Sequence, residues 1–111
     1  MIKSGDIWLI DFDPTIGHEQ AGRRPAVVIS GNAMNDHFGI SIVCPLTTAI
    51  KNMAGAVILK PDSLNCLKKT SEVLGMHVKS VSHQRFLKKI GTIDTIIRQK
   101  IIDNIHNILK Y

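Results

Sequence analysis

Apolar and polar positions alternate at short spacing along most of the chain, and this pattern predicts a mostly β protein. Short apolar runs, rich in β-branched side chains, are separated by clusters of glycine, proline and polar residues. The predicted strands are residues 7–12, 26–30, 40–46, 56–60 and 72–81, with 86–93 as a sixth strand or a turn. Gly75 falls inside the fifth of these runs and marks a position for a bulge.

The last segment changes to a helical pattern. Isoleucines at 97, 101, 105 and 108 recur at the spacing of one helix face, and Asp94 precedes them as a candidate N-cap. Residues 32–37 are expected to form a loop or one helical turn, and residues 62–69 a short helix capped by Asp62. The fold class predicted from these elements is α+β: one domain, residues 1–111, built as a small, mostly antiparallel barrel with a C-terminal helix.

Composition narrows the function classes. The formal net charge of +5 suits a polyanionic partner, either RNA or an acidic protein. No apolar run reaches the ~18–20 residues of a membrane span, and no hydrophobic region of a signal peptide is present, so we expect a cytoplasmic protein with no membrane partner. Cys44 and Cys66 lack the spacing of a disulfide framework, and both are expected to be buried, reduced thiols.

The segment between the first two predicted strands, residues 13–25, gathers groups suited to RNA chemistry. It holds an imidazole (His18), a carboxylate (Glu19) and two guanidinium groups (Arg23 and Arg24). RNA supplies its own nucleophile, the 2′-hydroxyl, so cleavage needs proton transfer and stabilisation of the phosphorane charge, and it needs no metal or other cofactor. Pro25 should hold Arg24 extended, because the residue before proline avoids the helical region.

This segment also resembles a known family. The run GDIWLIDFDPTIGHEQAGRRPAVVIS is similar to the N-terminal signature of the MazF/PemK toxins, which are sequence-specific mRNA endoribonucleases of toxin–antitoxin pairs. A weaker similarity continues through VCPLTT and VKSV to the C-terminal helix. The resemblance implies an SH3-like barrel that works as a homodimer, with single-stranded mRNA as substrate and an acidic MazE-like antitoxin as partner. The products would end in a 2′,3′-cyclic phosphate and a 5′-hydroxyl.

The resemblance also implies roles for individual residues. Arg24 and Thr47 correspond to catalytic residues of the family, and the PemK branch links the histidine at His18 to RNA binding or catalysis. Glu19 is a further candidate for proton transfer. We expect RNA contacts from Arg23, Gln20, Thr48, Lys79 and Arg85.

The chain departs from the family pattern in the segment 76–82. Many members carry an acidic residue, a glutamine, an arginine and an aspartate where this chain has Met76, His77, Lys79 and Ser82. The acid and base roles assigned to that arginine and aspartate cannot transfer, because serine is no general base and lysine lacks the bidentate fork. Proton transfer would then fall to His18 or Glu19, with His77 and His83 as alternatives.

Three other functions remain open from the sequence. A zinc hydrolase would draw on the candidate ligands His18, His37, His77, His83, Cys44 and Cys66, none of which has motif spacing. A gyrase-poisoning toxin, such as CcdB, shares the expected architecture, since fold does not settle function. A homologue that has lost catalysis and only binds RNA or an antitoxin is the third.

Overall fold

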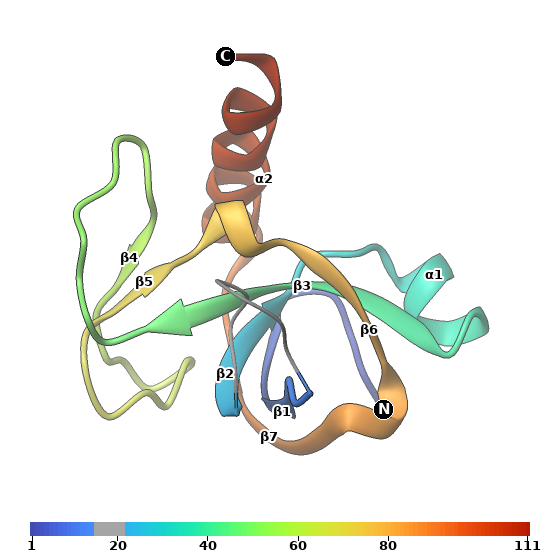
Figure 1. The fold of residues 1–111 in the computed structure, drawn as a ribbon. Helices are drawn as coiled ribbons and strands as arrows, with labels where there is room; N and C mark the ends of the chain where they lie inside the picture. Colours follow the sequence, from blue (N-terminus) through green and yellow to red (C-terminus); the bar gives the residue numbers. More distant parts are fainter. Residues whose placement is uncertain (15–21) are drawn as a thin grey trace.

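The structure is a computed structural model, which describes residues 1–14 and 22–111. Within these residues it has seven strands and a long C-terminal helix, where the sequence predicted five or six strands and the same helix (Figure 1). The strands are β1 (Asp6–Asp11), β2 (Arg23–Val28), β3 (Ile40–Thr47), β4 (Ile58–Leu59), β5 (Ser71–Val73), β6 (Lys79–Ser82) and β7 (Phe86–Thr92). The helices are α1 (Asn32–His37), α2 (Thr95–Lys110) and two 3-10 turns, η1 (Gly75–His77) and η2 (His83–Arg85).

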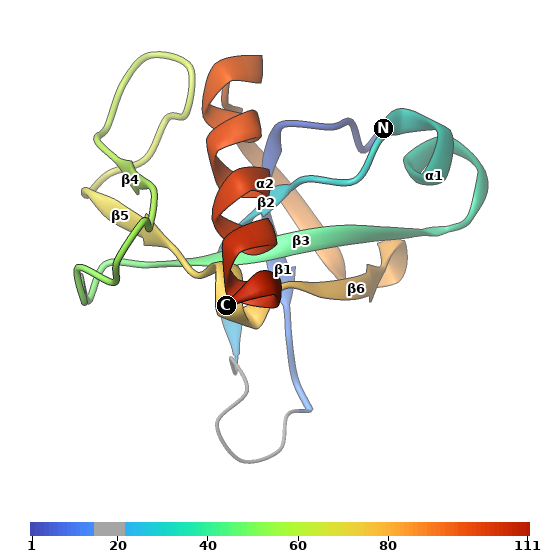
Figure 2. The same cartoon turned by 90° about the horizontal axis from the view of Figure 1, so that it is seen from above.

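The strands form one antiparallel sheet that curls into a half-barrel, as predicted. Its order is β4-β5-β3-β2-β1-β7, and β6 pairs with β3 beside β5. The long strand β3 is therefore paired with β2 along one edge and with β6 and then β5 along the other. It runs across the whole molecule from α1 to the β4–β5 end (Figures 1 and 2).

Two apolar clusters hold the sheet. One joins Ile7, Val27 and Cys44 to Ile101 of α2, and the other joins Ile10, Val28 and Val43. Successive side chains of a strand point to opposite faces, so the two clusters lie on opposite sides of the sheet. This explains why β1 and β2 are apolar at consecutive positions: each strand is covered on both faces.

Helix α2 has the predicted start and the predicted buried face. The side chain of Asp94 accepts a hydrogen bond from the amide of Ile97 (2.8 Å), which is an N-cap. Ile101 is buried, and Ile97 and Ile105 pack beside it. Arg98 fixes the helix to the end of β2, because its guanidinium donates two hydrogen bonds to the carbonyl of Ile29 (3.2 and 2.7 Å).

The single strand predicted over residues 72–81 is wrong. Between β5 and β6 the register along β3 shifts by three residues, and the three residues of η1 take up that shift. A Cβ at Gly75 would lie 2.6 Å from Oδ1 of Asn104, so a glycine allows η1 to pack against α2. The glycine that suggested a bulge therefore marks a full turn.

The helix predicted over residues 62–69 is also wrong. Asp62 does accept hydrogen bonds from the amides of Leu64 and Asn65 (2.9 and 2.7 Å), as an N-cap would. The chain nevertheless leaves the helical path at Cys66, whose φ is +54°. The buried side chain of Asn65 holds the turn by bonding the carbonyl of Lys60 and the amides of Asp62 and Leu67.

Only one of the two cysteines is buried as predicted. Cys44 lies in the core, and its burial raises the pKa of the thiol to about 12. Cys66 is exposed, because it stands on the surface turn that replaces the predicted helix. Both thiols are free.

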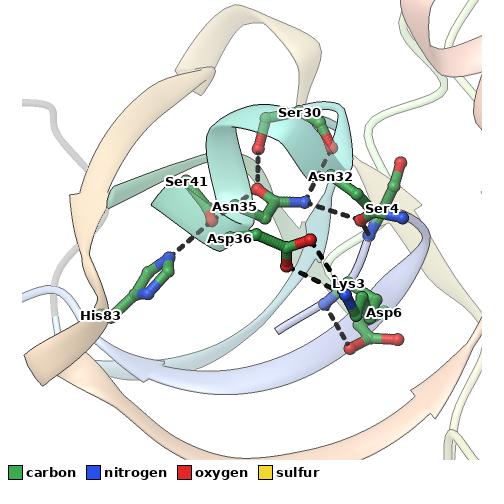
Figure 3. A network of polar contacts seen from close by, with 9 residues as sticks. All are labelled: Lys3, Ser4, Asp6, Ser30, Asn32, Asn35, Asp36, Ser41 and His83. Carbon is green, nitrogen blue, oxygen red and sulfur yellow. Dashed lines mark hydrogen bonds and ion pairs between the residues drawn. The ribbon is translucent and has the colours of Figure 1, made fainter. Parts of the chain in front are cut away.

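A polar network ties the N-terminus and α1 to the start of β3 (Figure 3). The hydroxyls of Ser30 and Ser41 both donate to Oδ1 of Asn35 (2.5 and 2.6 Å). Since the proton of Ser41 is used in this way, its oxygen accepts from Nε2 of His83 (2.8 Å). Lys3 and Asp36 add an ion pair of 2.9 Å at the rim. The network lies at the opposite end of β3 from Thr47.

Within residues 1–14 and 22–111, no helix combines the length and the apolar character that crossing a membrane requires.

Candidate active site

The candidate site lies where β1 and β2 meet the segment between them. The amide of Phe12 donates to the carbonyl of Gly22 (2.9 Å), and the amide of Gly22 donates to the carboxylate of Asp13 (2.9 Å). From the other side, the guanidinium of Arg85 donates to the carbonyls of Asp11 and Asp13. These contacts extend the pairing of the two strands to Phe12 and Gly22, a point that we call the mouth of the segment. The residues beside the mouth therefore have fixed positions.

Arg24 and Thr47 lie just beyond the last paired residues of β2 and β3. That last pair is Ala26 with Pro45, and Arg24 and Thr47 are each two residues further along their strands. Because side chains alternate along a strand, Arg24 shares a face with Ala26 and Thr47 shares a face with Pro45, so both belong to the same face of the sheet. Both residues are half-buried, and Arg24 is extended in β2 before Pro25, as predicted.

The neighbouring residues Arg23 and Thr48 belong to the opposite face by the same alternation. There a cleft of about 360 Å³ opens beside the ends of the two strands. It is lined by Gly22, Arg23, Arg24, Pro25, Leu46, Thr48 and Ser71. Arg24 also lines this cleft, although its side chain belongs to the other face by strand alternation.

A buried carboxylate holds the loop that follows Thr47. Glu72 pairs with Thr47 across β3 and β5 and has no exposed surface. Its two oxygens accept hydrogen bonds from the amides of Lys51, Asn52 and Met53 at 2.7, 2.9 and 3.3 Å. Bonds from consecutive amides to a carboxylate are charge-assisted and compensate its burial. Thr47 itself accepts from the amide of Ala49 (3.1 Å), so its hydroxyl hydrogen is directed elsewhere.

The structure places Lys79 and Arg85 together on the other side of the mouth. Both line a cavity of about 230 Å³ with Phe12 and Ser82. The ammonium of Lys79 lies 5.8 Å from the centre of the Phe12 ring, within the range of a cation–π contact. The two cations predicted for RNA contact therefore flank the mouth opposite Arg23 and Thr48.

Three of the candidate residues, His18, Glu19 and Gln20, lie outside the described residues. The alternative proton-transfer groups do not join Arg24. His83 uses Nε2 in the polar network beside α1, and His77 belongs to η1 against α2. Ser82 caps η2 by accepting from the amide of Gln84 (3.3 Å).

Across the part of the chain that the structure describes, no three groups of the kind His, Cys, Asp or Glu come together in a metal-binding arrangement. The candidate zinc ligands are separated instead: Cys44 is in the core, Cys66 on the 60–67 turn and His83 in the network beside α1.

Two residues of the site were missed from the sequence. Glu72 and Asp13 act through backbone amides far along the chain or across the mouth, at separations of 19–21 and 9 residues. Such contacts leave no local pattern. The one available sign was an acidic residue, Glu72, at the start of the strand predicted over residues 72–81.

Comparison with known proteins identifies the family of this chain and known structures with the same fold. A family model described as the PemK-like, MazF-like toxin of type II toxin-antitoxin systems matches residues 3–109. The chain is 38% identical over 90 residues to the endoribonuclease toxin MazF of Escherichia coli K12, covering 80% of this chain and 77% of that protein.

Solved structures agree over almost the full length. MazF from Deinococcus radiodurans superposes with a TM-score of 0.85 at 28% identity, covering 99% of this chain and 97% of that one. A MazE–MazF structure from the same organism gives 0.78 at 28% identity, covering 98% and 96%.

Proposed function

Because the chain belongs to the PemK-like, MazF-like toxins of type II toxin–antitoxin systems and is an endoribonuclease, we propose that it cuts single-stranded mRNA at a short sequence without a metal ion. The observation that supports this proposal is the pairing of Ala26 with Pro45 across β2 and β3, because Arg24 and Thr47 each follow two residues further along on the same face of the sheet. Single-stranded RNA suits the site because its bases are open to recognition. This substrate would place the activity in the cytoplasm.

In this mechanism the 2′-oxygen attacks the adjacent phosphorus. The bond between O2′ and phosphorus forms, the bond to O5′ breaks, the 2′-hydroxyl gives its proton to a base and the 5′-oxygen gains one from an acid. The products are a 2′,3′-cyclic phosphate and a 5′-hydroxyl. Arg24 stabilises the charge of the phosphorane through its fork of donors, and Thr47 orients the phosphate with its hydroxyl.

Proton transfer is assigned to His18 and Glu19. An imidazole titrates near neutral pH, which suits both halves of the transfer. The alternatives lie elsewhere, because Nε2 of His83 is bonded to Ser41 and His77 belongs to η1. Further RNA contacts are assigned to Arg23 and Thr48 on one side, to Lys79 and Arg85 on the other, and to Gln20.

The partner that restrains the toxin is proposed to be an acidic, MazE-like antitoxin. The net charge of +5 favours such a partner, and a MazE–MazF structure is among the folds to which this chain is similar. The toxin itself is proposed to act as a homodimer. Support comes from apolar side chains left exposed at the C-terminal end of α2 and on η1, including Leu109 (80% exposed) and Met76 (48%).

The test is cleavage of a long unstructured RNA by the purified protein in the presence of EDTA. Wild type and Arg24→Ala are compared, and the chemistry of the product ends is mapped. We expect discrete cuts that end in cyclic phosphate, reduced by about 10²-fold or more in the variant. Intact RNA from a correctly folded sample would refute the proposal. An assay of gyrase supercoiling on the same sample tests the CcdB-like alternative.

A further inference from the structure

A second and larger groove adjoins the candidate active site. It has a volume of about 610 Å³, within the ~300–1,000 Å³ range of ligand sites. Pro25, Thr48 and Ser71 line both this groove and the cleft that Arg23 and Arg24 reach. A chain bound in the cleft can therefore continue into the groove without leaving the surface.

Four lysines from two distant segments line the groove: Lys68 and Lys69 from the turn before β5, and Lys88 and Lys89 from β7. Among the residues that the structure describes, no acidic residue lines it. Lys89 is held by the buried carboxylate of Asp6 (3.4 Å). For the other three, no ion pair is present within residues 1–14 and 22–111, and all three are exposed.

The groove also has an apolar lining. Leu9, Leu67 and Ile90 contribute to it and are half-buried, whereas the lysines are exposed. Exposed lysines beside a half-buried apolar lining match a nucleic acid strand, whose phosphates carry the charge and whose bases present flat apolar faces. The groove thus has the features expected of a track for single-stranded RNA.

We propose that this groove binds the RNA chain beyond the cut site, with phosphates on Lys68, Lys69 and Lys88. The inference rests on the proposed function, since it needs an RNA strand in the cleft. Continuity with the cleft favours RNA over an acidic protein segment, because Arg24, which is proposed to contact the phosphate that is cut, also lines the cleft that adjoins the groove. The groove then contributes to affinity for long substrates and not to the chemical step.

The test compares three lysines inside the groove with three outside it. The groove variant is Lys68→Gln, Lys69→Gln, Lys88→Gln, and the control is Lys60→Gln, Lys100→Gln, Lys110→Gln. The control lysines are exposed and lie outside the groove, so both proteins lose the same charge. Lys89 is left unchanged, because removing its charge would take the ion pair from the buried carboxylate of Asp6.

The substrates are a short RNA that spans only the mapped cut site and the same RNA extended on its 5′ side or on its 3′ side. Binding is measured with RNAs whose attacking 2′-hydroxyl is replaced by hydrogen, and KM and kcat with cleavable ones. Wild type should prefer one of the extended RNAs. The groove variant should lose that preference, with binding about ten-fold weaker, kcat unchanged and the salt slope reduced by about 2.

Three outcomes would overturn the proposed role of the groove. In the first, wild type binds short and extended RNAs equally. In the second, the control variant loses as much affinity for extended RNA as the groove variant does; in the third, the groove variant loses binding to polyglutamate and keeps its preference for extended RNA, which would assign the groove to an acidic protein. Protein that cuts no RNA at all refutes the proposed function, whereas protein that cuts RNA without any dependence on these lysines refutes only the groove.

Discussion

At the scale of one residue, a substitution of Arg24 can separate the contribution of the guanidinium geometry from that of the positive charge. In the proposed mechanism its planar guanidinium donates two hydrogen bonds to one phosphate. Arg24→Lys keeps the positive charge and loses the fork, so we expect kcat to fall by about 10²-fold with a smaller change in KM. Single-turnover cleavage checks this. Arg23→Lys is the matched comparison, and its effect should appear mainly in KM.

An Arg24→Lys variant with the kcat of wild type would mean that charge alone suffices at this position, and the proposed bidentate contact would be withdrawn.

Cys44 makes a prediction for alkaline pH. Burial raises the pKa of its thiol to about 12 from the ordinary 9, so the folded protein keeps a proton that the unfolded chain releases between these values. The free energy of unfolding should therefore be unaffected by this group below about pH 9 and should fall as pH rises from about 9 toward 12.

Urea unfolding of wild type and Cys44→Ala at several pH values measures this contribution. The variant should be less stable at neutral pH, because it leaves a cavity, and its stability should decline less between pH 9 and pH 11. Parallel declines in both proteins would exclude Cys44 as the source.

At the scale of elements, the loop after β3 depends on one acidic side chain. Glu72 accepts three backbone amide bonds while fully buried. Glu72→Gln puts an amide group where an acceptor is needed, and we expect a loss of about 1–3 kcal/mol in the free energy of unfolding. Amide exchange at Lys51, Asn52 and Met53 should accelerate. Unchanged exchange there would show that the loop is held by other contacts.

The elements also show how far the sequence could be interpreted. Helix α2 was predicted because its period and its cap, Asp94, are both local features. The predictions from local features were wrong where tertiary contacts determine the secondary structure. Asn65 bonds the carbonyl of Lys60 and ends a turn that Asp62 had begun as a helix, and packing of η1 on α2 splits one predicted strand into two.

The same division holds for the site. The extended position of Arg24 followed from Pro25, a neighbour in sequence. That Arg24 and Thr47 share a face beside the last pair of β2 and β3 depends on the register of these strands, which no local pattern contains. The roles of His18, Glu19 and Gln20 stay predictions, since these residues lie outside the described part of the chain.

At the scale of the whole molecule, the exposed end of α2 tests the proposed homodimer. Leu109 is 80% exposed at this end, and Ile96 is 67% exposed at the other end of the same helix. We expect wild type to sediment as a dimer, Leu109→Asp to shift toward the monomer and Ile96→Asp to stay dimeric, because a buried unpaired charge disfavours association. A wild type that sediments as a monomer would contradict the proposed homodimer.

The hydrogen bonds at the mouth between β1 and β2 have a consequence for how such a protein could diversify. Gly22 bonds both Phe12 and Asp13, and Arg85 of η2 donates to the carbonyls of Asp11 and Asp13. These contacts support the strand pairing beside Arg24 from residues on either side of the stretch 15–21. We expect that replacing residues 15–21 with the corresponding stretch of a relative, while His18 and Glu19 are kept, will alter which RNA is chosen and leave the thermal unfolding of the barrel nearly the same.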